Sequence, residues 1–390
     1  MLEILIALTT LSAPGPWPAT VPYPKDLQLN QDTRSDRHYD ELEVLAGVQP
    51  AKKRGALIRT YFQILPEGSS QPATTTWKNW EPLLLAKGWK VVGSDGSRHS
   101  LSRTEAGKTI WLDIRLADFD QPLVGILTEG TSPEVLKLSP PAAKLGPVSE
   151  SKDWPFLPRF PGSTLTGSGV QDQPWTLTFP GDTEETLIAE HYTLKSYRPP
   201  PSLSRLETQL SYAEALKKAG WEVLPLVENE SSVIGHYAKD GHNLWAAVGR
   251  AADDGDSGLS ISLADLGATD WGQALDKECR IALIGVHFDF DKSTLRADSA
   301  PVLEKALAAI KARPKLKLEI QGHTDSVGDP GHNQTLSEAR AASVRSWLVD
   351  KGAPAANLSA RGFGKNHPIA DNDSPAGRAK NRRVELACQK

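Results

Sequence analysis

The sequence predicts a multidomain α+β protein, in which two related small α+β domains precede a β-α-β-α-β module. With 390 residues, the chain is too long for one ordinary domain. One pattern of strands, a helix and paired tryptophans occurs twice before residue 270, and the remainder alternates strand-like and helix-like segments. We name residues 20–138 region 1, residues 156–270 region 2 and residues 276–390 the C-terminal module.

The first residues are similar to the end of a secretory signal. An apolar run over residues 4–8 leads to Leu11-Ser12-Ala13, which is typical of an h-region followed by a small-residue cleavage site. No Lys or Arg precedes the run, so the alternative is the first strand of the mature domain. We expect residues 1–19 to be a signal remnant. We expect no lipoprotein anchor, because no Cys follows the run.

Regions 1 and 2 are predicted to be two copies of one unit. Matching segments are separated by 130 to 137 residues, so the copies would differ only by small loop insertions. The matches are 57–62 with 187–192, 84–92 with 216–224, 108–111 with 242–245, and Tyr23-Pro24 with Phe160-Pro161.

Each copy is expected to contain a strand, a helix, a strand, a turn, a further strand and a final strand. The helix should end at Gly88 in region 1 and at Gly220 in region 2, because glycine adopts the left-handed conformation of a helix C-terminus at little cost. Residues 139–155, which include Pro140-Pro141, are predicted to be a Pro-rich linker between the regions. Residues 268–276 should form a short bridge to the C-terminal module.

The tryptophans admit two interpretations, core packing or stacking platforms for sugar rings. Those present in both copies lie at helix-to-strand junctions or in apolar strands, so we expect them in the core. Three tryptophans that occur in one copy only are better candidates for a surface role: Trp77, Trp80 and Trp175.

In the C-terminal module, a strand is expected between two helices. Residues 299–313 carry an apolar stripe and precede Pro314, so they should form the first helix. Residues 315–320 alternate polar and apolar side chains, as a strand with one buried face does. Thr335 and Glu338 fit a capping box, which predicts a second helix from Thr335 to Lys351.

Asp325 and Arg340 are the most informative pair of residues. Asp325 ends the loop segment Gly322-His323-Thr324-Asp325, and Arg340 stands in the apolar stripe of the second helix. A charged residue in such a stripe needs a partner. One interpretation is a structural ion pair with a nearby acid. The other is a ligand site in which the carboxylate binds an ammonium and the guanidinium binds a carboxylate.

Further motifs surround this pair in a fixed order. They are residues 286–295, Asn333, Arg361-Gly362-Phe363-Gly364, residues 368–372 and residues 377–385. In this order and spacing, residues 278–386 resemble the C-terminal, OmpA-like domain of the OmpA family.

This resemblance implies noncovalent binding of peptidoglycan through the diaminopimelate of its peptide stem. Asp325 and Arg340 would hold the zwitterionic end of diaminopimelate. The supporting positions that carry over are Asp289, Asp291, Thr324, Asn333 and Arg382. Asp291 is the least certain of these, because family members carry Asp or Asn there. The resemblance also implies an exported protein of the periplasm, associated with the outer membrane or the cell wall.

Composition excludes several other functions. A net charge of −4, without a basic cluster, gives no footprint for nucleic acid. No apolar run approaches the length of a membrane-spanning helix. His323 and Asp325 could bind a metal, but no further ligand pair accompanies them, so we expect neither a metal nor a cofactor. No catalytic motif is present, and we expect no enzyme.

The two cysteines bracket the C-terminal module. Cys279 precedes its first strand, and Cys388 lies at the end of its last strand. In an exported protein, a disulfide between them is a simpler explanation than two free thiols. We therefore predict the bridge, with two unpaired thiols as the alternative.

The function predicted from the sequence is anchoring of an exported envelope protein to peptidoglycan. A rival class is a peptidoglycan-active enzyme with its catalytic part in regions 1 and 2. A third possibility is an adaptor whose N-terminal domains dock other envelope proteins.

Overall fold

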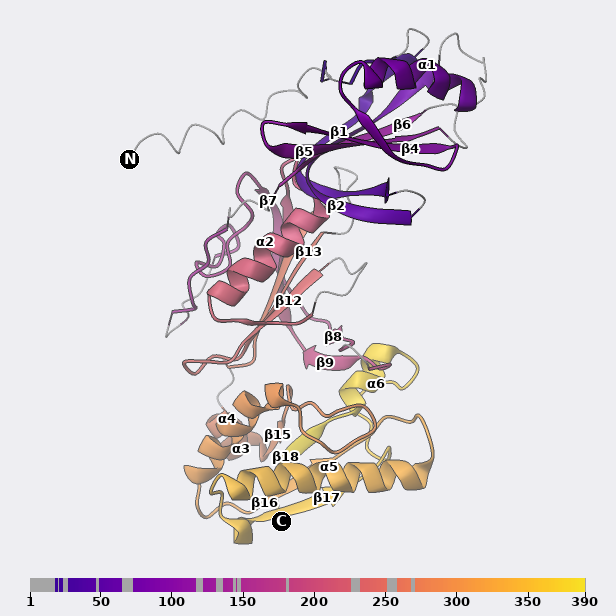
Figure 1. Ribbon diagram of the computed structural model, residues 1–390. Helices are drawn as coiled ribbons and strands as arrows, with labels where there is room; N and C mark the ends of the chain where they lie inside the picture. The colour runs from indigo at the N-terminus through magenta and orange to yellow at the C-terminus, as the bar shows by residue number, and fades with distance from the viewer. Residues whose placement is uncertain are drawn as a thin grey trace.

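Three units follow one another along the chain, each with its own β-sheet (Figure 1). Region 1 lies at the top of the view, region 2 in the middle and the C-terminal module at the bottom. The computed structural model describes residues 18–19, 21–23, 27–46, 49–64, 73–116, 122–130, 136–142, 145, 149–179, 182–225, 232–250, 258–267 and 271–389. Apart from residues 18–19, the predicted signal remnant lies outside the described residues.

Region 1 is a six-stranded antiparallel sheet in the order β1-β2-β6-β5-β4-β3, with one helix. Its elements are β1 (Leu27–Ala46), β2 (Gln49–Ile64), α1 (Ala73–Leu85), β3 (Lys90–Ser94), β4 (Arg98–Glu105), β5 (Lys108–Arg115) and β6 (Leu123–Glu129). Trp80 and Leu84 lie one turn apart on α1 and are fully buried in a cluster with Leu101 and Leu112 of the sheet. The helix therefore covers one face of the sheet.

The surface role predicted for Trp80 is wrong. This side chain is buried, and its Nε1 donates a hydrogen bond to the carbonyl of Pro22 at 2.7 Å. Its four-residue spacing from Leu84 puts it on the inner stripe of α1. Trp77 is half-buried and stacks on His99, with ring centroids 3.7 Å apart. Trp175 is half-buried against Tyr192.

Region 2 also has a six-stranded antiparallel sheet, in the order β11-β12-β13-β14-β10-β7. Its elements are β7 (Thr164–Gln171), β10 (Tyr192–Arg198), α2 (Arg205–Lys218), β11 (Glu222–Val223), β12 (Ser232–Tyr237), β13 (Leu244–Arg250) and β14 (Leu259–Asp265). A separate two-stranded sheet, β8 (Trp175–Leu177) with β9 (Thr186–Ala189), is inserted between β7 and β10. Ser204 caps α2 by accepting a hydrogen bond from the backbone of Glu207.

The two sheets share one strand order. Region 1 runs from β2 through α1 to β3, β4, β5 and β6; region 2 runs from β10 through α2 to β11, β12, β13 and β14. Gly88 and Gly220 have φ of 82° and 86°, which confirms the predicted left-handed helix ends. Trp89 and Trp221 are buried next to them.

One of the predicted sequence matches does not fall on equivalent strands. Residues 57–62 lie within β2, whereas residues 187–192 span the end of β9 and the start of β10. That regions 1 and 2 are copies of one unit therefore stays a prediction, supported by the shared strand order.

The C-terminal module has a four-stranded sheet in the order β15-β18-β16-β17. Its elements are α3 (Trp271–Glu278), β15 (Arg280–Ala282), η1 (Ala297–Ser299), α4 (Ala300–Lys311), β16 (Leu318–Gly322), α5 (Pro330–Asp350), η2 (Ala355–Asn357), β17 (Leu358–Gly362), α6 (Pro375–Asn381) and β18 (Val384–Cys388). The predicted β-α-β-α-β order is confirmed from β15 to β17. After it, α6 leads to β18, which is inserted between β15 and β16.

The second helix begins earlier than predicted. The helix α5 starts at Pro330, and the carboxylate of Asp329 caps it by accepting hydrogen bonds from the backbone of Gly331 and His332. Proline at the first helical position has no N–H to leave unsatisfied, so Asp329-Pro330 is a stronger start than the predicted capping box. Thr335 lies inside the helix, and its hydroxyl donates to the carbonyl of Gly331.

The segments between the units are packed. Trp154 of the predicted linker is buried in the core of region 2. Part of the predicted bridge is the helix α3, and Trp271 and Leu275 of this helix enter the core of the C-terminal module. Both connections thus contribute apolar side chains to a neighbouring core.

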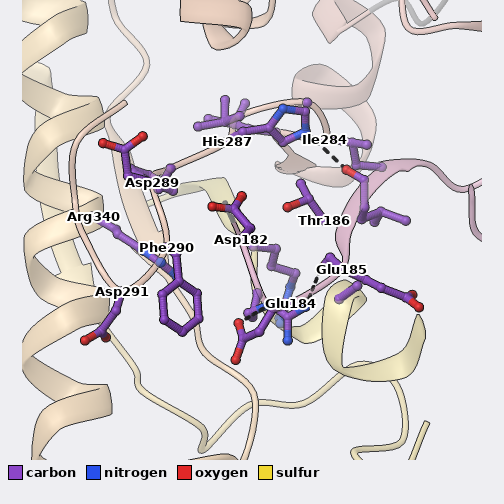
Figure 2. A pocket seen from close by; sticks show the side chains of 18 residues that line it. Asp182, Glu184, Glu185, Thr186, Ile284, His287, Asp289, Phe290, Asp291 and Arg340 are labelled. Carbon is purple, nitrogen blue, oxygen red and sulfur yellow. Dashed lines mark hydrogen bonds and ion pairs between the residues drawn. The ribbon is translucent and has the colours of Figure 1, made fainter. Parts of the chain in front are cut away.

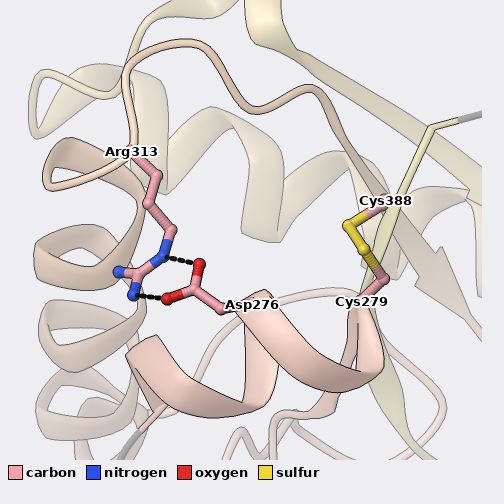
Figure 3. Close-up of a disulfide and its surroundings, with 4 residues drawn as sticks. All are labelled: Asp276, Cys279, Arg313 and Cys388. Carbon is pink, nitrogen blue, oxygen red and sulfur yellow. Dashed lines mark hydrogen bonds and ion pairs between the residues drawn. A yellow bond between two sulfur atoms is a disulfide. The ribbon is translucent and has the colours of Figure 1, made fainter.

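A disulfide joins Cys279 and Cys388, as predicted (Figure 3). The strands β15 and β18 are antiparallel neighbours, and the two Cα atoms are 5.1 Å apart. Close by, Arg313 forms a forked ion pair with Asp276 of α3, at 2.7 and 2.6 Å. The disulfide and the ion pair both connect the C-terminal end of α3 to the rest of the module.

Candidate functional site

The candidate site lies where the parallel strands β16 and β17 end beside α5. The helix approaches the strand ends closely. A Cβ atom on Gly322 would lie 2.2 Å from the carbonyl oxygen of Ser337, and one on Gly362 would lie 2.4 Å from the backbone nitrogen of Glu338. Glycine is therefore required at both strand ends. This contact places Arg340, one turn further along α5, beside the loop that follows β16.

Asp325 is held firmly in that loop. Its side chain is buried, accepts a hydrogen bond from the backbone of Val327 at 3.0 Å and forms an ion pair with Arg382. The Thr324 hydroxyl donates to the backbone carbonyl of Asp325, and the Asn333 side chain donates to the carbonyl of Val327 at 2.8 Å. Thr324 and Asn333 thus fix the loop backbone that presents Asp325.

Arg340 is half-buried and forms no ion pair with any described carboxylate. Its Nε donates to the carbonyl of Lys292 at 3.0 Å, and its guanidinium lies 5.0 Å from the centre of the Phe288 ring. Burial, followed by the positive charge of Arg382, lowers the pKa of Arg340 to about 10. An arginine in such a place favours a negatively charged partner.

Asp289 and Asp291 lie on the loop after β15, and both side chains are exposed. Asp291 contacts His332, with Oδ1 and Nε2 2.7 Å apart. Asp289 lies 4.0 Å from Lys292. Figure 2 shows both carboxylates on the same side of the pocket as Arg340.

A pocket of about 80 Å³ brings four of the seven predicted ligand residues together. Its wall includes Asp289, Asp291, Arg340 and Arg382. Asp325 adjoins this pocket through its ion pair with Arg382. Thr324 and Asn333 do not line it and act through the loop backbone.

Sequence reasoning missed the part of the wall that region 2 supplies. Asp182, Glu184, Glu185, Thr186 and Leu187 line the same pocket (Figure 2). They precede the module by about a hundred residues and belong to no motif. A local sequence pattern therefore had no means of assigning them to the site.

His323 is a buried, neutral side chain. Its ring stacks on Phe363 with centroids 5.3 Å apart. Burial, followed by the positive charge of Arg383, lowers its pKa to about 4. In the part of the chain that the structure describes, no group of three or more His, Cys, Asp or Glu side chains is arranged to hold a metal.

The fold and these residues define a small α/β domain with paired acidic and basic side chains at one edge of its sheet. Residues 287–382 match the sequence model of the OmpA family, so the C-terminal module carries an OmpA family domain, as the motifs predicted. The match does not extend to regions 1 and 2.

Relatives in the OmpA family are similar to about a quarter of this chain. The outer-membrane lipoprotein YfiB of Pseudomonas aeruginosa is 45% identical over 26% of this chain and 60% of its own length. Outer membrane protein A of Bordetella avium is 43% identical over 25% of this chain and 51% of its own length. Outer membrane porin F of Pseudomonas fluorescens is 40% identical over 27% of this chain and 32% of its own length. The chain thus spans less than two thirds of each.

A solved structure, that of the peptidoglycan-associated lipoprotein from Burkholderia pseudomallei, is 34% identical with a TM-score of 0.26. The similarity covers 27% of this chain and 88% of that chain. Within the described residues, no helix combines the length and the apolar character needed to cross a membrane.

Proposed function

We propose that the C-terminal module binds peptidoglycan through the diaminopimelate of its peptide stem and so anchors this protein to the cell wall. The observation that carries the proposal is the state of Arg340. Its guanidinium is half-buried and has no described carboxylate as a partner, although the buried carboxylate of Asp325 belongs to the same site. The OmpA family domain supports the same ligand.

The chemistry of the ligand suits this arrangement. The free end of diaminopimelate carries an ammonium and a carboxylate on one carbon. The two terminal nitrogens of Arg340 donate to no described acceptor, so they are free to take that carboxylate as a fork. The Asp325 carboxylate accepts hydrogen bonds from the ammonium.

The other predicted residues have supporting roles in this proposal. Asp289 and Asp291 add negative charge to the pocket wall for the ammonium. Arg382 orients the Asp325 carboxylate through their ion pair. Thr324 and Asn333 hold the loop that carries Asp325.

The proposal also concerns location and regions 1 and 2. Outer-membrane relatives and an OmpA family domain support a place in the periplasm, at the outer membrane or the cell wall. Regions 1 and 2 would be two copies of one unit. This part rests on their shared strand order.

A binding assay with insoluble peptidoglycan sacculi tests the function. Asp325→Ala and Arg340→Ala should each lower affinity about 30-fold or more, because removing one partner of a buried charge-assisted contact costs roughly 2–5 kcal/mol. Free diaminopimelate should compete with sacculi, and a simple monocarboxylic amine should compete less.

Arg345→Ala is the matched control. Arg345 lies on the same helix but donates to the carbonyls of Leu358 and Ala355 and does not line the pocket. This variant should bind sacculi as the natural protein does. The assignment fails if Asp325→Ala or Arg340→Ala, shown folded by circular dichroism, still sediments with sacculi like the natural protein.

A further inference from the structure

The peptide pocket is built by two domains. The segment 182–187, which leads into β9 of region 2, forms one wall, and the loop after β15 with α5 forms the other. Figure 2 shows the side chains of Asp182 and Glu184 directed into the space between these walls. Carboxylates from another domain therefore line the pocket that we assign to the ligand.

Region 2 occupies Arg382 directly. One terminal nitrogen of Arg382 donates to Asp325, the other donates to the backbone carbonyl of Glu185, and Nε lies 3.6 Å from the Glu184 carboxylate. Two of the three guanidinium nitrogens thus contact the segment 182–187. Arg382, which orients Asp325, is therefore also held by region 2.

Glu184 is the acidic side chain suited to compete with a ligand. The Glu185 carboxylate is held by the hydroxyl of Thr176 at 2.6 Å, within the β8–β9 sheet. The Glu184 side chain is 39% exposed and contacts Arg382. Among the nearby carboxylates, Glu184 also raises the pKa of Arg340 the most, which partly offsets the lowering by burial.

Contacts on both sides hold the segment against the module. At one end, Asp182 forms an ion pair with Arg296 at 3.4 Å. At the other end, the Leu187 carbonyl lies 3.2 Å from Nε2 of His287. The His287 ring is in turn held by Asp298 at 2.9 Å. The segment therefore has a defined position over the pocket.

The size of the pocket fits a closed site. Its volume is about 80 Å³. Pockets that hold small ligands usually measure about 300–1,000 Å³. The segment 182–187 thus narrows the space open to the end of a diaminopimelate residue.

We propose that the segment 182–187 partly closes the peptide site, with the Glu184 carboxylate held by Arg382 beside the position of the ligand carboxylate, and that the peptide stem binds by displacing the segment. The proposal rests on the proposed function of the site and adds its regulation. Region 2 lowers the affinity of the module by placing a negative charge beside the site of the ligand carboxylate. Anything that draws region 2 away from the module would strengthen the anchor.

The test uses the full chain and sacculi. Glu184→Gln removes the competing charge and should raise affinity about 1.5- to 5-fold, the effect of a partly exposed ion pair. Glu190→Gln is the matched control, because it makes the same change in region 2 outside the pocket, and it should leave affinity unchanged. Unchanged or weaker binding of Glu184→Gln would overturn the closure.

A second measurement follows the segment itself. Free diaminopimelate at saturating concentration should speed hydrogen exchange at the amides of residues 182–187, because displacement opens their contacts. Slower or unchanged exchange would mean that the ligand does not displace the segment.

The Arg340→Ala variant distinguishes failure of the proposed function from failure of the proposed closure. If natural protein and Arg340→Ala bind sacculi equally, the function itself fails and the closure with it. If binding depends on Arg340 but Glu184→Gln changes nothing, only the closure fails.

Discussion

Regions 1 and 2 have the same strand order but use one face of the sheet differently. The sequence pairs Trp111 of β5 with Trp245 of β13. Trp111 is half-buried; its Nε1 donates to Glu129 at 2.8 Å, and Lys53 lies over its ring at 4.4 Å. Trp245 is only 1% exposed.

Trp245 is buried where the inserted β8–β9 segment of region 2 meets the C-terminal module. Its ring stacks on His236 at 4.3 Å and lies 6.1 Å from both Phe179 and His287. His287 belongs to the module, and Phe179 precedes the β9 strand that borders the peptide pocket. A position shared by two similar sheets can thus be surface in one and an interface in the other. The inserted β8–β9 sheet accompanies this difference.

The largest expected effect tests this contrast directly. Trp245→Ala should reduce the free energy of unfolding by about 3–5 kcal/mol, because it empties a fully buried aromatic site. Trp111→Ala should cost only about 1 kcal/mol, since its ring is half-exposed. Urea unfolding followed by circular dichroism measures both.

The same pair of variants also separates local from interface effects. Trp245→Ala should weaken the hold of region 2 on the module and speed hydrogen exchange in residues 182–187, whereas Trp111→Ala should not. Equal losses of stability in the two variants would contradict the difference inferred between the sheet faces that carry Trp111 and Trp245.

The sequence predicted the elements well where periodicity is strong. The α4 helix and the β16 strand lie within a few residues of their expected bounds, because one apolar stripe and one alternating run define them. The start of α5 was missed, because a local cap at Asp329 competed with a plausible one at Thr335. Trp80 was misplaced because its occurrence in one copy only says nothing about burial, whereas its four-residue spacing from Leu84 puts it on the buried stripe of α1.

The candidate site was predictable only within the C-terminal module. Asp325, Arg340 and Arg382 were found from motifs whose order and spacing resemble those of the OmpA-like domain. The pairing of these residues was not predicted, because the ion pair between Asp325 and Arg382 joins residues 57 positions apart. Glu184 lies still further away, in another domain, and only the packing of region 2 on the module brings it to the pocket.

Acidification should weaken both regions through one buried histidine in each. His99 stacks on Trp77 in region 1, and His236 stacks on Trp245 in region 2. Burial lowers the pKa of both rings from 6.5, because it disfavours the charged form. The unfolded chain therefore binds more protons below about pH 6.5, so the stability that each neutral ring contributes is present above that pH and is lost as pH falls through the lower folded value.

Urea midpoints at pH 7.5 and pH 5.5 measure this loss. His99→Gln and His236→Gln should each make stability less dependent on pH, since glutamine does not titrate. His191→Gln is the control, because the His191 side chain is exposed and contacts an exposed Asp172. If His99→Gln and His236→Gln both lose as much stability on acidification as the natural protein does, other groups cause the loss.

The smallest expected effect tests whether the two regions share their helix ends. Gly88→Ala and Gly220→Ala should each cost about 1–2 kcal/mol, because both glycines have positive φ and an L-residue is strained there. Steric clashes add little: an added Cβ meets nothing within 4 Å at Gly88, and at Gly220 its nearest neighbour is the flexible end of Lys239, at 3.4 Å. Urea unfolding should give similar losses at the two positions. Gly96→Ala is a control at a turn of region 1, where φ is 92°. It should cost a similar free energy of unfolding and measures the strain of alanine at positive φ away from a helix end. A loss at one helix end without the other would mean that the equivalence of the two junctions is only apparent.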